Sequence, residues 1–445
     1  MKVITLLSTV ALTIQLSAQN TDKIEAFVDS LIESQLDSNA FAGTSILVNY
    51  KGETILQKGY GLASVELDAP INEKSTFEIG SVTKQFTAVS ILKLVETGKL
   101  SLEDNFNKYL KFDTKGFEIP IYRLLNHTSG IKSYTSIPEF WDLSKSDYDR
   151  DTLVRLIETK PFGFAPGEEL SYNNSAYFFL GLIIEEVSGQ SYETFVDSAI
   201  FRPLGMDNSY YCSNSIIRKN EVYGYKHNGE ELMKTPFLNH IWPFSGGSLC
   251  SNTGDMLKWL QALHHGKVLN EEYYKLLTTP GKLNNGWELR YAMGLEHSNY
   301  SGHERLGHGG ATLGFLSETR YFPKDELYII CLMNTTGGYG PGEIADAITW
   351  QLLDEVEPES VKVDVKSKDI DGRYIHLFDT DTFAYDLSLV NNQLLMHSIN
   401  WDFTDTISIY LGDNTWYIDN DFVKVKDGTY QIDNVYGNYI FKRED

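Results

Sequence analysis

Apolar residues recur at the spacing of an amphipathic helix in several separate stretches of the chain. Between Thr21 and Leu36 the apolar side chains fall three or four positions apart, as on one face of a helix. The same period predicts further helices at Val82–Lys99, Ser175–Ser188, Thr253–His264 and Glu343–Val356.

Strand-like runs lie between these helices. Thr44–Asn49 and Glu53–Tyr60 are joined by the turn Tyr50-Lys51-Gly52, which predicts a hairpin. Strand character returns over Arg305–Phe322 and Leu327–Asn334. The order of these segments indicates a mixed α+β fold with an antiparallel sheet.

The pattern changes after Glu357-Pro358-Glu359, because no helical period follows it. Alternating runs with hairpin turns at Asn391-Asn392 and Asp427-Gly428 predict antiparallel strands. These strands are expected at Phe383–Val390, Gln393–Ile399, Thr406–Leu411, Thr415–Ile418, Phe422–Lys426, Thr429–Val435 and Tyr439–Lys442. We therefore expect two domains, at residues 19–358 and 365–445, the second being a small barrel or sandwich.

The N-terminal residues have the pattern of a signal peptide. Lys2 precedes an apolar run, Val3–Leu16, which ends in the small residues Ser17 and Ala18. We expect residues 1–18 to be removed and the protein to be periplasmic or secreted. The alternative is a buried N-terminal helix. No later run is long enough to span a bilayer.

Composition narrows the partners of the chain. With 42% hydrophobic and 22% charged residues, the 445-residue chain can bury a large core. Its formal charge of -23 argues against a nucleic acid or an anionic lipid surface as a partner. The three cysteines are odd in number and widely spaced, which predicts buried thiols rather than a disulfide framework or a zinc site.

The motifs of several enzyme classes are absent, but the pair S-x-x-K occurs three times. On a helix the two residues share one face, so an unprotonated lysine can take the serine proton during attack on a carbonyl. Only Ser81 of the pair Ser81/Lys84 follows a glycine and opens a helical pattern, where the positive end of the helix could stabilise an oxyanion. The alternative is an ordinary capping serine with a solvated lysine.

Two further short motifs support this chemistry. In Tyr172-Asn173-Asn174, an extended backbone would point Tyr172 and Asn174 the same way, so that a phenolate could relay protons while the amide orients Lys84. Alternatively, Asn174 caps the next helix and Tyr172 packs in the core. In His308-Gly309-Gly310 the glycines would let a substrate backbone approach a strand.

The ordered set Ser81-x-x-Lys84, Tyr172-x-Asn174 and His308-x-Gly310 resembles the serine β-lactamase and penicillin-binding-protein superfamily, in its class C-like branch. The likeness runs from about Thr21 to Val356. The flanking segments that share it are Phe77–Ala88, Leu124–Gly130, Phe201–Met206 and Gly307–Phe315.

The resemblance implies an antiparallel sheet with helices on both faces, an all-helical lobe, and an active site between them. It implies that Ser81 attacks an acyl carbonyl, that Lys84 and Tyr172 share the role of base, and that Asn174 assists them. The oxyanion hole would be the backbone N–H groups of Ser81 and Ala311. His308, Gly309 and Gly310 would bind substrate, and neither a metal nor an organic cofactor is implied.

His308 stands where typical β-lactamases carry a lysine. This difference favours an exported hydrolase of D-amino-acid peptides, small esters or β-lactams over a dedicated resistance enzyme. Histidine titrates near pH 6.5, so a preference for carboxylate substrates is expected to rise in acid.

Several alternatives stay open at this point. The protein could be a penicillin-binding sensor that is acylated without turnover, or an acyltransferase. His127 is expected to be structural, and the loop Ser245–Leu249 either lines the cleft or only packs tightly. The residues after 365 resemble lipocalin-like β domains, whose aromatics form either a ligand platform or a core. The partner is a small-molecule or peptide acyl substrate, and the sequence sets no oligomeric state.

Overall fold

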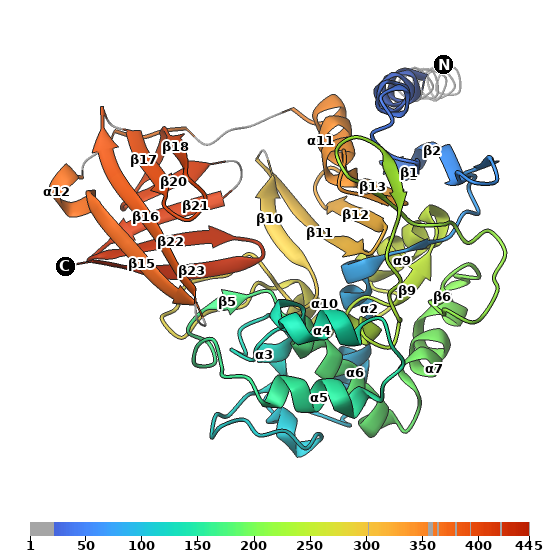
Figure 1. Cartoon of the computed structure of the whole chain (residues 1–445), viewed down its shortest axis with the longest axis horizontal. Coiled ribbons are helices and arrows are strands. Elements are labelled where there is room, and N and C mark those ends of the chain that lie inside the picture. Colours follow the sequence, from blue (N-terminus) through green and yellow to red (C-terminus); the bar gives the residue numbers. More distant parts are fainter. Residues whose placement is uncertain are drawn as a thin grey trace, which may run out of the picture.

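The computed structural model describes residues 22–300, 302–354, 359–362, 365–378, 381–391, 393–418 and 421–444. A central sheet with helices on both faces, a helical lobe and a second, C-terminal sheet make up this part of the chain (Figure 1). None of its helices has the length and apolar character needed to cross a bilayer. The predicted signal peptide, residues 1–18, lies outside the described residues.

The central sheet has the strand order β10-β11-β12-β13-β1-β2-β3. Its strands are β1 (Gly43–Tyr50), β2 (Glu53–Ser64), β3 (Ala69–Pro70), β10 (Glu296–Tyr300), β11 (His303–Thr312), β12 (Phe315–Phe322) and β13 (Leu327–Met333). The predicted hairpin is confirmed as β1 and β2, and β1 also pairs with the late strand β13. The strand expected over Arg305–Phe322 is two strands, because the chain turns at Gly314 with a φ of +94°.

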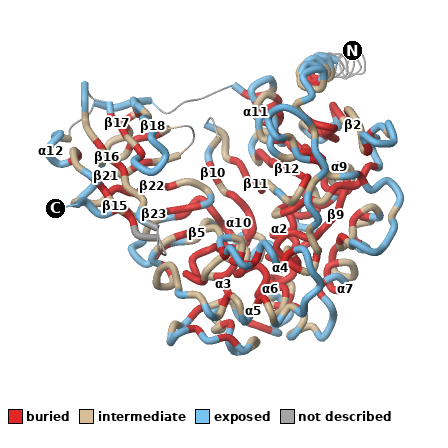
Figure 2. The backbone as a smooth tube through the Cα atoms, viewed as in Figure 1, coloured by how far each residue is buried: buried red, intermediate tan, exposed pale blue. Residues whose placement is uncertain are grey.

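Both faces of this sheet are buried, as alternating side chains require. Ile46 and Val48 of β1 pack in one core and Leu47 packs in the other. The helix at residues 22–37 and α11 (Pro341–Leu352) cover the first face. The second face is covered by α2 (Thr83–Glu96) and α9 (Thr253–His264), and Figure 2 shows the buried strands between these layers.

The helical lobe surrounds α2 and α6 (Asn174–Ser188), which pack against each other. Its other helices are α3 (Ile121–Leu125), α4 (Pro138–Leu143), α5 (Arg150–Glu158), α7 (Tyr192–Val196), α8 (Arg202–Leu204) and α10 (Glu271–Thr278). Two small sheets join the lobe to the central sheet, formed by β4 (Phe77–Glu78), β6 (Tyr210–Tyr211) and β9 (Leu249–Ser251), and by β7 (Tyr225–His227), β8 (Leu232–Lys234) and β14 (Thr335–Thr336).

The C-terminal sheet curls around a core of its own. Its strands are β15 (Gly372–Phe378), β16 (Asp381–Val390), β17 (Gln393–Ser398), β18 (Phe403–Ile407), β19 (Ile409–Gly412), β20 (Thr415–Ile418), β21 (Asp421–Lys426), β22 (Thr429–Asn434) and β23 (Gly437–Arg443). The short helix α12 (Ser367–Ile370) corrects the expectation that no helix follows residue 359. Most of the aromatics fill the core, including Tyr374, Tyr410, Trp416 and Tyr430, as the core alternative expects, whereas Trp401 and Tyr436 are exposed.

One disulfide corrects the prediction of unpaired thiols. Cys212 and Cys250 are bonded, while Cys331 is free and buried. Cys250 lies on β9 and Cys212 directly follows β6, its partner strand, so the fold brings the two thiols together. The odd cysteine count and the wide spacing concealed this pairing.

Candidate active site

Ser81 and Lys84 lie at the start of α2, where the helical lobe meets the central sheet. Ser81 belongs to a 3₁₀ turn, Gly80–Val82, that leads into the helix. Its side chain does not cap α2, and Lys84 is fully buried, so the alternative of a capping serine beside a solvated lysine is wrong. The Nζ atom of Lys84 lies 3.1 Å from the Oγ atom of Ser81.

The surroundings of Lys84 suit an uncharged amine. Burial lowers the pKa of Lys84 well below its usual value. Its Nζ atom also lies 2.8 Å from both the Oδ1 atom of Asn174 and the carbonyl oxygen of Gly246. A neutral amine has two N–H bonds and one lone pair. These two oxygens accept its hydrogens, which leaves the lone pair for the Ser81 hydroxyl.

The neighbouring residues Asn173 and Asn174 have different roles. Asn173 caps α6 by accepting a hydrogen bond of 2.9 Å from the Ala176 N–H. The side chain of Asn174 is therefore free to bind Lys84, contrary to the alternative that Asn174 only caps the helix. The Gly246 contact similarly brings the loop Ser245–Leu249 to the cleft.

Tyr172 faces the same pair. The Lys84 Nζ atom lies 4.8 Å from the centre of the Tyr172 ring. Burial raises the pKa of the Tyr172 hydroxyl well above 10, although the hydroxyl of Ser81 nearby lowers it somewhat. No described residue forms a hydrogen bond with this hydroxyl within 3.5 Å. Tyr172 is therefore a neutral phenol in the free protein, not a phenolate.

Two glycines let the Ser81 turn and strand β11 approach closely. A Cβ atom on Gly80, whose φ is +50°, would lie 2.6 Å from the backbone nitrogen of Ala311. A Cβ atom on Gly310 would lie 2.2 Å from the Ile79 carbonyl oxygen. The absence of both side chains brings the segments carrying the Ser81 and Ala311 N–H groups together, as the predicted oxyanion hole requires.

His308 is fully buried at the edge of the site. Its Nε2 atom lies 2.9 Å from the Tyr291 hydroxyl, and its Nδ1 atom contacts the Gly309 carbonyl oxygen. Burial lowers the pKa of His308 to about 4, although Glu296 opposes the shift. The imidazole is thus mostly neutral at pH 7. The lowered pKa moves any rise in carboxylate preference at His308 to a more acidic pH than the ordinary value of 6.5 predicts.

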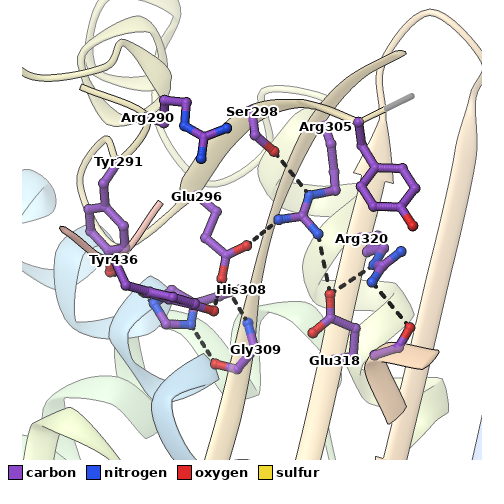
Figure 3. A network of polar contacts seen from close by, with 12 residues as sticks. Arg290, Tyr291, Glu296, Ser298, Arg305, His308, Gly309, Glu318, Arg320 and Tyr436 are labelled. Atoms are coloured by element: carbon purple, nitrogen blue, oxygen red, sulfur yellow. Dashed lines mark hydrogen bonds and ion pairs between the residues drawn. The ribbon is translucent and has the colours of Figure 1, made fainter. Parts of the chain in front are cut away.

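The cleft has two lobes, which share Ser81 and Ala311. Most of the accessible wall of both lobes is apolar. We call the lobe of about 230 Å³ the apolar lobe, and the lobe of about 400 Å³ the polar lobe because Tyr172, His308 and Glu318 lie in its lining. The apolar lobe is lined mainly by Tyr134, Phe140, Trp141, Leu238, Pro243 and Leu313. Besides the shared residues, the polar lobe is lined by Tyr172, His308, Gly309, Gly310, Leu316, Ser317, Glu318, Pro341 and Tyr436, and Figure 3 shows some of its polar side chains.

Several residues that line or adjoin this cleft were not predicted as part of the active site. Tyr291, Glu296, Glu318 and Tyr436 belong to no motif, and tertiary contacts alone bring them to the cleft. His127 contacts the segment that carries Tyr172 and Asn174, in keeping with the structural role expected of it. Its Nδ1 atom accepts a hydrogen bond of 3.1 Å from the Asn173 N–H, and its ring centre lies 4.4 Å from that of Tyr172.

Comparison with known proteins finds relatives for most of the chain. The family model described as "Beta-lactamase" matches residues 28–353. The putative penicillin-binding protein PbpX of Bacillus subtilis is 29% identical over 327 residues, which are 73% of this chain and 78% of PbpX.

Two solved structures have a similar fold. The octameric penicillin-binding protein homologue from Pyrococcus abyssi is 26% identical, with a TM-score of 0.67 over 93% of this chain and 99% of its own. The D-amino acid amidase from Ochrobactrum anthropi is 22% identical, with a TM-score of 0.64 over 73% of this chain and 97% of its own.

Proposed function

Because the chain belongs to the β-lactamase family, we propose that it is a serine hydrolase that cleaves amide or ester bonds through an acyl-enzyme on Ser81. The observation that carries this proposal is the 3.1 Å contact between the Ser81 hydroxyl and the fully buried amine of Lys84. Burial favours the uncharged amine, which is the form that can accept a proton.

In the first step Ser81 Oγ bonds to the substrate carbonyl carbon while its proton passes to Lys84 Nζ. The N–H groups of Ser81 and Ala311 stabilise the negative oxygen of the tetrahedral intermediate. The bond to the leaving group then breaks, and the leaving group takes the proton from Lys84. Asn174 and Gly246 hold the amine in place throughout.

In the second step a water molecule attacks the acyl ester, and the same amine accepts its proton. Breaking the ester bond releases the acid and returns the proton to Ser81. Tyr172 stays protonated in this scheme, because burial raises its pKa. We therefore assign the role of base to Lys84 and a hydrogen-bonding role to the Tyr172 hydroxyl.

The substrates we propose are D-amino-acid peptides, small esters or β-lactams. The likeness to an amidase and to penicillin-binding proteins supports this range. PbpX also supports a second candidate, a penicillin-binding sensor that is acylated without turnover.

We further propose export to the periplasm or the medium, because the Cys212–Cys250 disulfide suits an oxidising compartment and residues 1–18 have a signal-peptide pattern.

The test is the intact mass of the protein after incubation with a fluorophosphonate and, separately, with penicillin. We expect one adduct per wild-type chain and none on Ser81→Ala. Ser90→Ala and Ser129→Ala, which change the serines of the other two S-x-x-K pairs, are matched controls and should label normally. Correctly folded wild type that neither reagent labels would refute the proposal. The lifetime of the penicillin adduct separates a hydrolase from a sensor.

A further inference from the structure

The C-terminal sheet reaches the catalytic cleft. Strand β23 pairs with the short strand β5 (Leu170–Ser171), directly before Tyr172, and Figure 1 shows β22 and β23 beside β5. The Tyr172 N–H donates a hydrogen bond of 3.0 Å to the carbonyl oxygen of Tyr436. Tyr436, between β22 and β23, is therefore carried into the polar lobe by backbone pairing.

Tyr436 offers an oxygen and an open ring face to this lobe. Its hydroxyl donates its hydrogen to Glu296, so the phenol oxygen can only accept a further hydrogen bond. Its ring packs edge-on against Tyr172, with centres 5.4 Å apart. The residue is still 41% exposed, which leaves it accessible to a molecule in the cleft.

Glu318 of β12 offers a second acceptor at the same place. Its Oε1 atom accepts a hydrogen bond of 2.8 Å from Arg320 and lies 3.6 Å from Arg305. Its Oε2 atom points the other way (Figure 3) and has no hydrogen-bond partner among the described residues. A Cβ atom on Gly309 would lie 3.2 Å from this oxygen and 3.3 Å from the Tyr436 hydroxyl, so both oxygens lie over Gly309.

The polar lobe lacks a cation that could bind a carboxylate. None of the described residues that line it is a lysine or an arginine. The nearby Arg305 binds Glu296, and Arg320 binds Asp346 as well as Glu318. His308 is neutral at pH 7, and both of its nitrogens have partners within the protein. Within a largely apolar wall, the lobe thus offers two hydrogen-bond acceptors, the Oε2 atom of Glu318 and the hydroxyl oxygen of Tyr436.

We propose that the polar lobe is a subsite for an ammonium group of the substrate, held by the Glu318 Oε2 and Tyr436 Oη atoms. The subsite would favour amino-bearing amides or esters over their carboxylate analogues. This inference rests on the proposed hydrolase function for its biological meaning. The binding site itself can be tested without the reaction.

The experiment measures binding to Ser81→Ala protein, which cannot form the acyl-enzyme. The probes are phenylalanine amide, its N-acetyl derivative, and benzylmalonamate, in which a carboxylate replaces the ammonium group. Dissociation constants from ligand-detected NMR titration should be at least tenfold lower for phenylalanine amide, of either hand, than for the other two probes. Equal affinities, or tighter binding of the carboxylate, would overturn the inference.

Variants made in the same Ser81→Ala background locate the site. Glu318→Gln keeps an oxygen for Arg320 but removes the charge, and should bring the preference for ammonium below about threefold. Tyr436→Phe keeps the ring and should reduce the preference by a smaller factor. Glu272→Gln, an exposed change on α10, is the matched control and should leave it unchanged. An unchanged preference in both site variants would contradict the assignment. Because fluorophosphonate labelling of Ser81 is measured separately, failure of the hydrolase function remains distinguishable.

Discussion

At the scale of single residues, the buried amine of Lys84 predicts how the reaction depends on pH. Burial lowers the pKa of Lys84, so the amine is protonated and inactive in acid and becomes a base as the pH rises. We expect kcat/KM for an ester to rise along one limb whose midpoint lies well below 10.5. Stopped-flow acylation from pH 4 to 10 measures this limb, and a midpoint near 10 would contradict a desolvated base.

The variant Lys84→Arg tests directly whether Lys84 is the base. Its guanidinium stays protonated at every accessible pH and cannot take the serine proton. We expect the acylation rate to fall by about 10²–10⁴-fold, the usual contribution of a general base. Lys93→Arg, at the lysine of another S-x-x-K pair, should keep the wild-type rate. If Lys84→Arg kept that rate, Lys84 would not be the base.

The sequence predicts only those site residues whose neighbours along the chain define them. Ser81 and Lys84 are one helical turn apart, and Asn174 is the first residue of a helix, so the local spacing is enough to predict their roles. The charge of His308 depends instead on burial by distant segments and on the nearby charges of Glu296 and Lys84. A histidine's ordinary pKa was therefore the wrong guide to its charge.

At the scale of elements, the approach of β11 to the Ser81 turn predicts a strict need for glycine. A methyl group on Gly310 would lie 2.2 Å from the Ile79 carbonyl oxygen and 2.3 Å from the Ser317 hydroxyl. Gly310→Ala must therefore push the strand away from Ser81. We expect the acylation rate to fall by about 10²–10³-fold, as on loss of an oxyanion donor.

Gly342→Ala on α11 is the matched control, because nothing lies within 4 Å of the added methyl group. It should leave kcat/KM unchanged and raise the free energy of unfolding by about 0.4–1 kcal/mol, since alanine has less freedom in the unfolded chain. Urea unfolding and ester hydrolysis measure both variants. Full activity in Gly310→Ala would show that this close approach is not needed.

Long periodic elements could be predicted, whereas short ones could not. Strand alternation identified β1, β2 and β13, and helical spacing identified α2, α6 and α9. The four-residue helix α12 has too few positions to establish a period. The turn at Gly314 lies inside one continuous strand-like stretch, so β11 and β12 were predicted as a single strand.

At the scale of the whole molecule, the docking of the C-terminal sheet on the cleft had no sequence signal. Strand β23 pairs with β5 through backbone hydrogen bonds, which every residue type except proline can both donate and accept. The alternation of the late strands predicted a sheet with a core, and the structure has one. Nothing in that alternation indicates that Tyr436 would complete a pocket beside Ser81.

The disulfide gives a prediction for the chain as a whole. Of its three cysteines, Cys212 and Cys250 are bonded and Cys331 is free, so oxidised protein denatured without reductant should show one reactive thiol, and three after reduction. Cys331→Ala should lower each count by one. A count of three before reduction would contradict the bond.

The same bond should stabilise the fold, because it joins residues 38 positions apart. Chain entropy for a loop of this length amounts to about 4 kcal/mol. We therefore expect the double variant Cys212→Ser and Cys250→Ser to unfold at a lower urea concentration than wild type. Added reductant should shift wild type toward the double variant and leave the double variant itself unchanged. A wild type that is indifferent to reductant would mean that the bond does not restrain the unfolded chain.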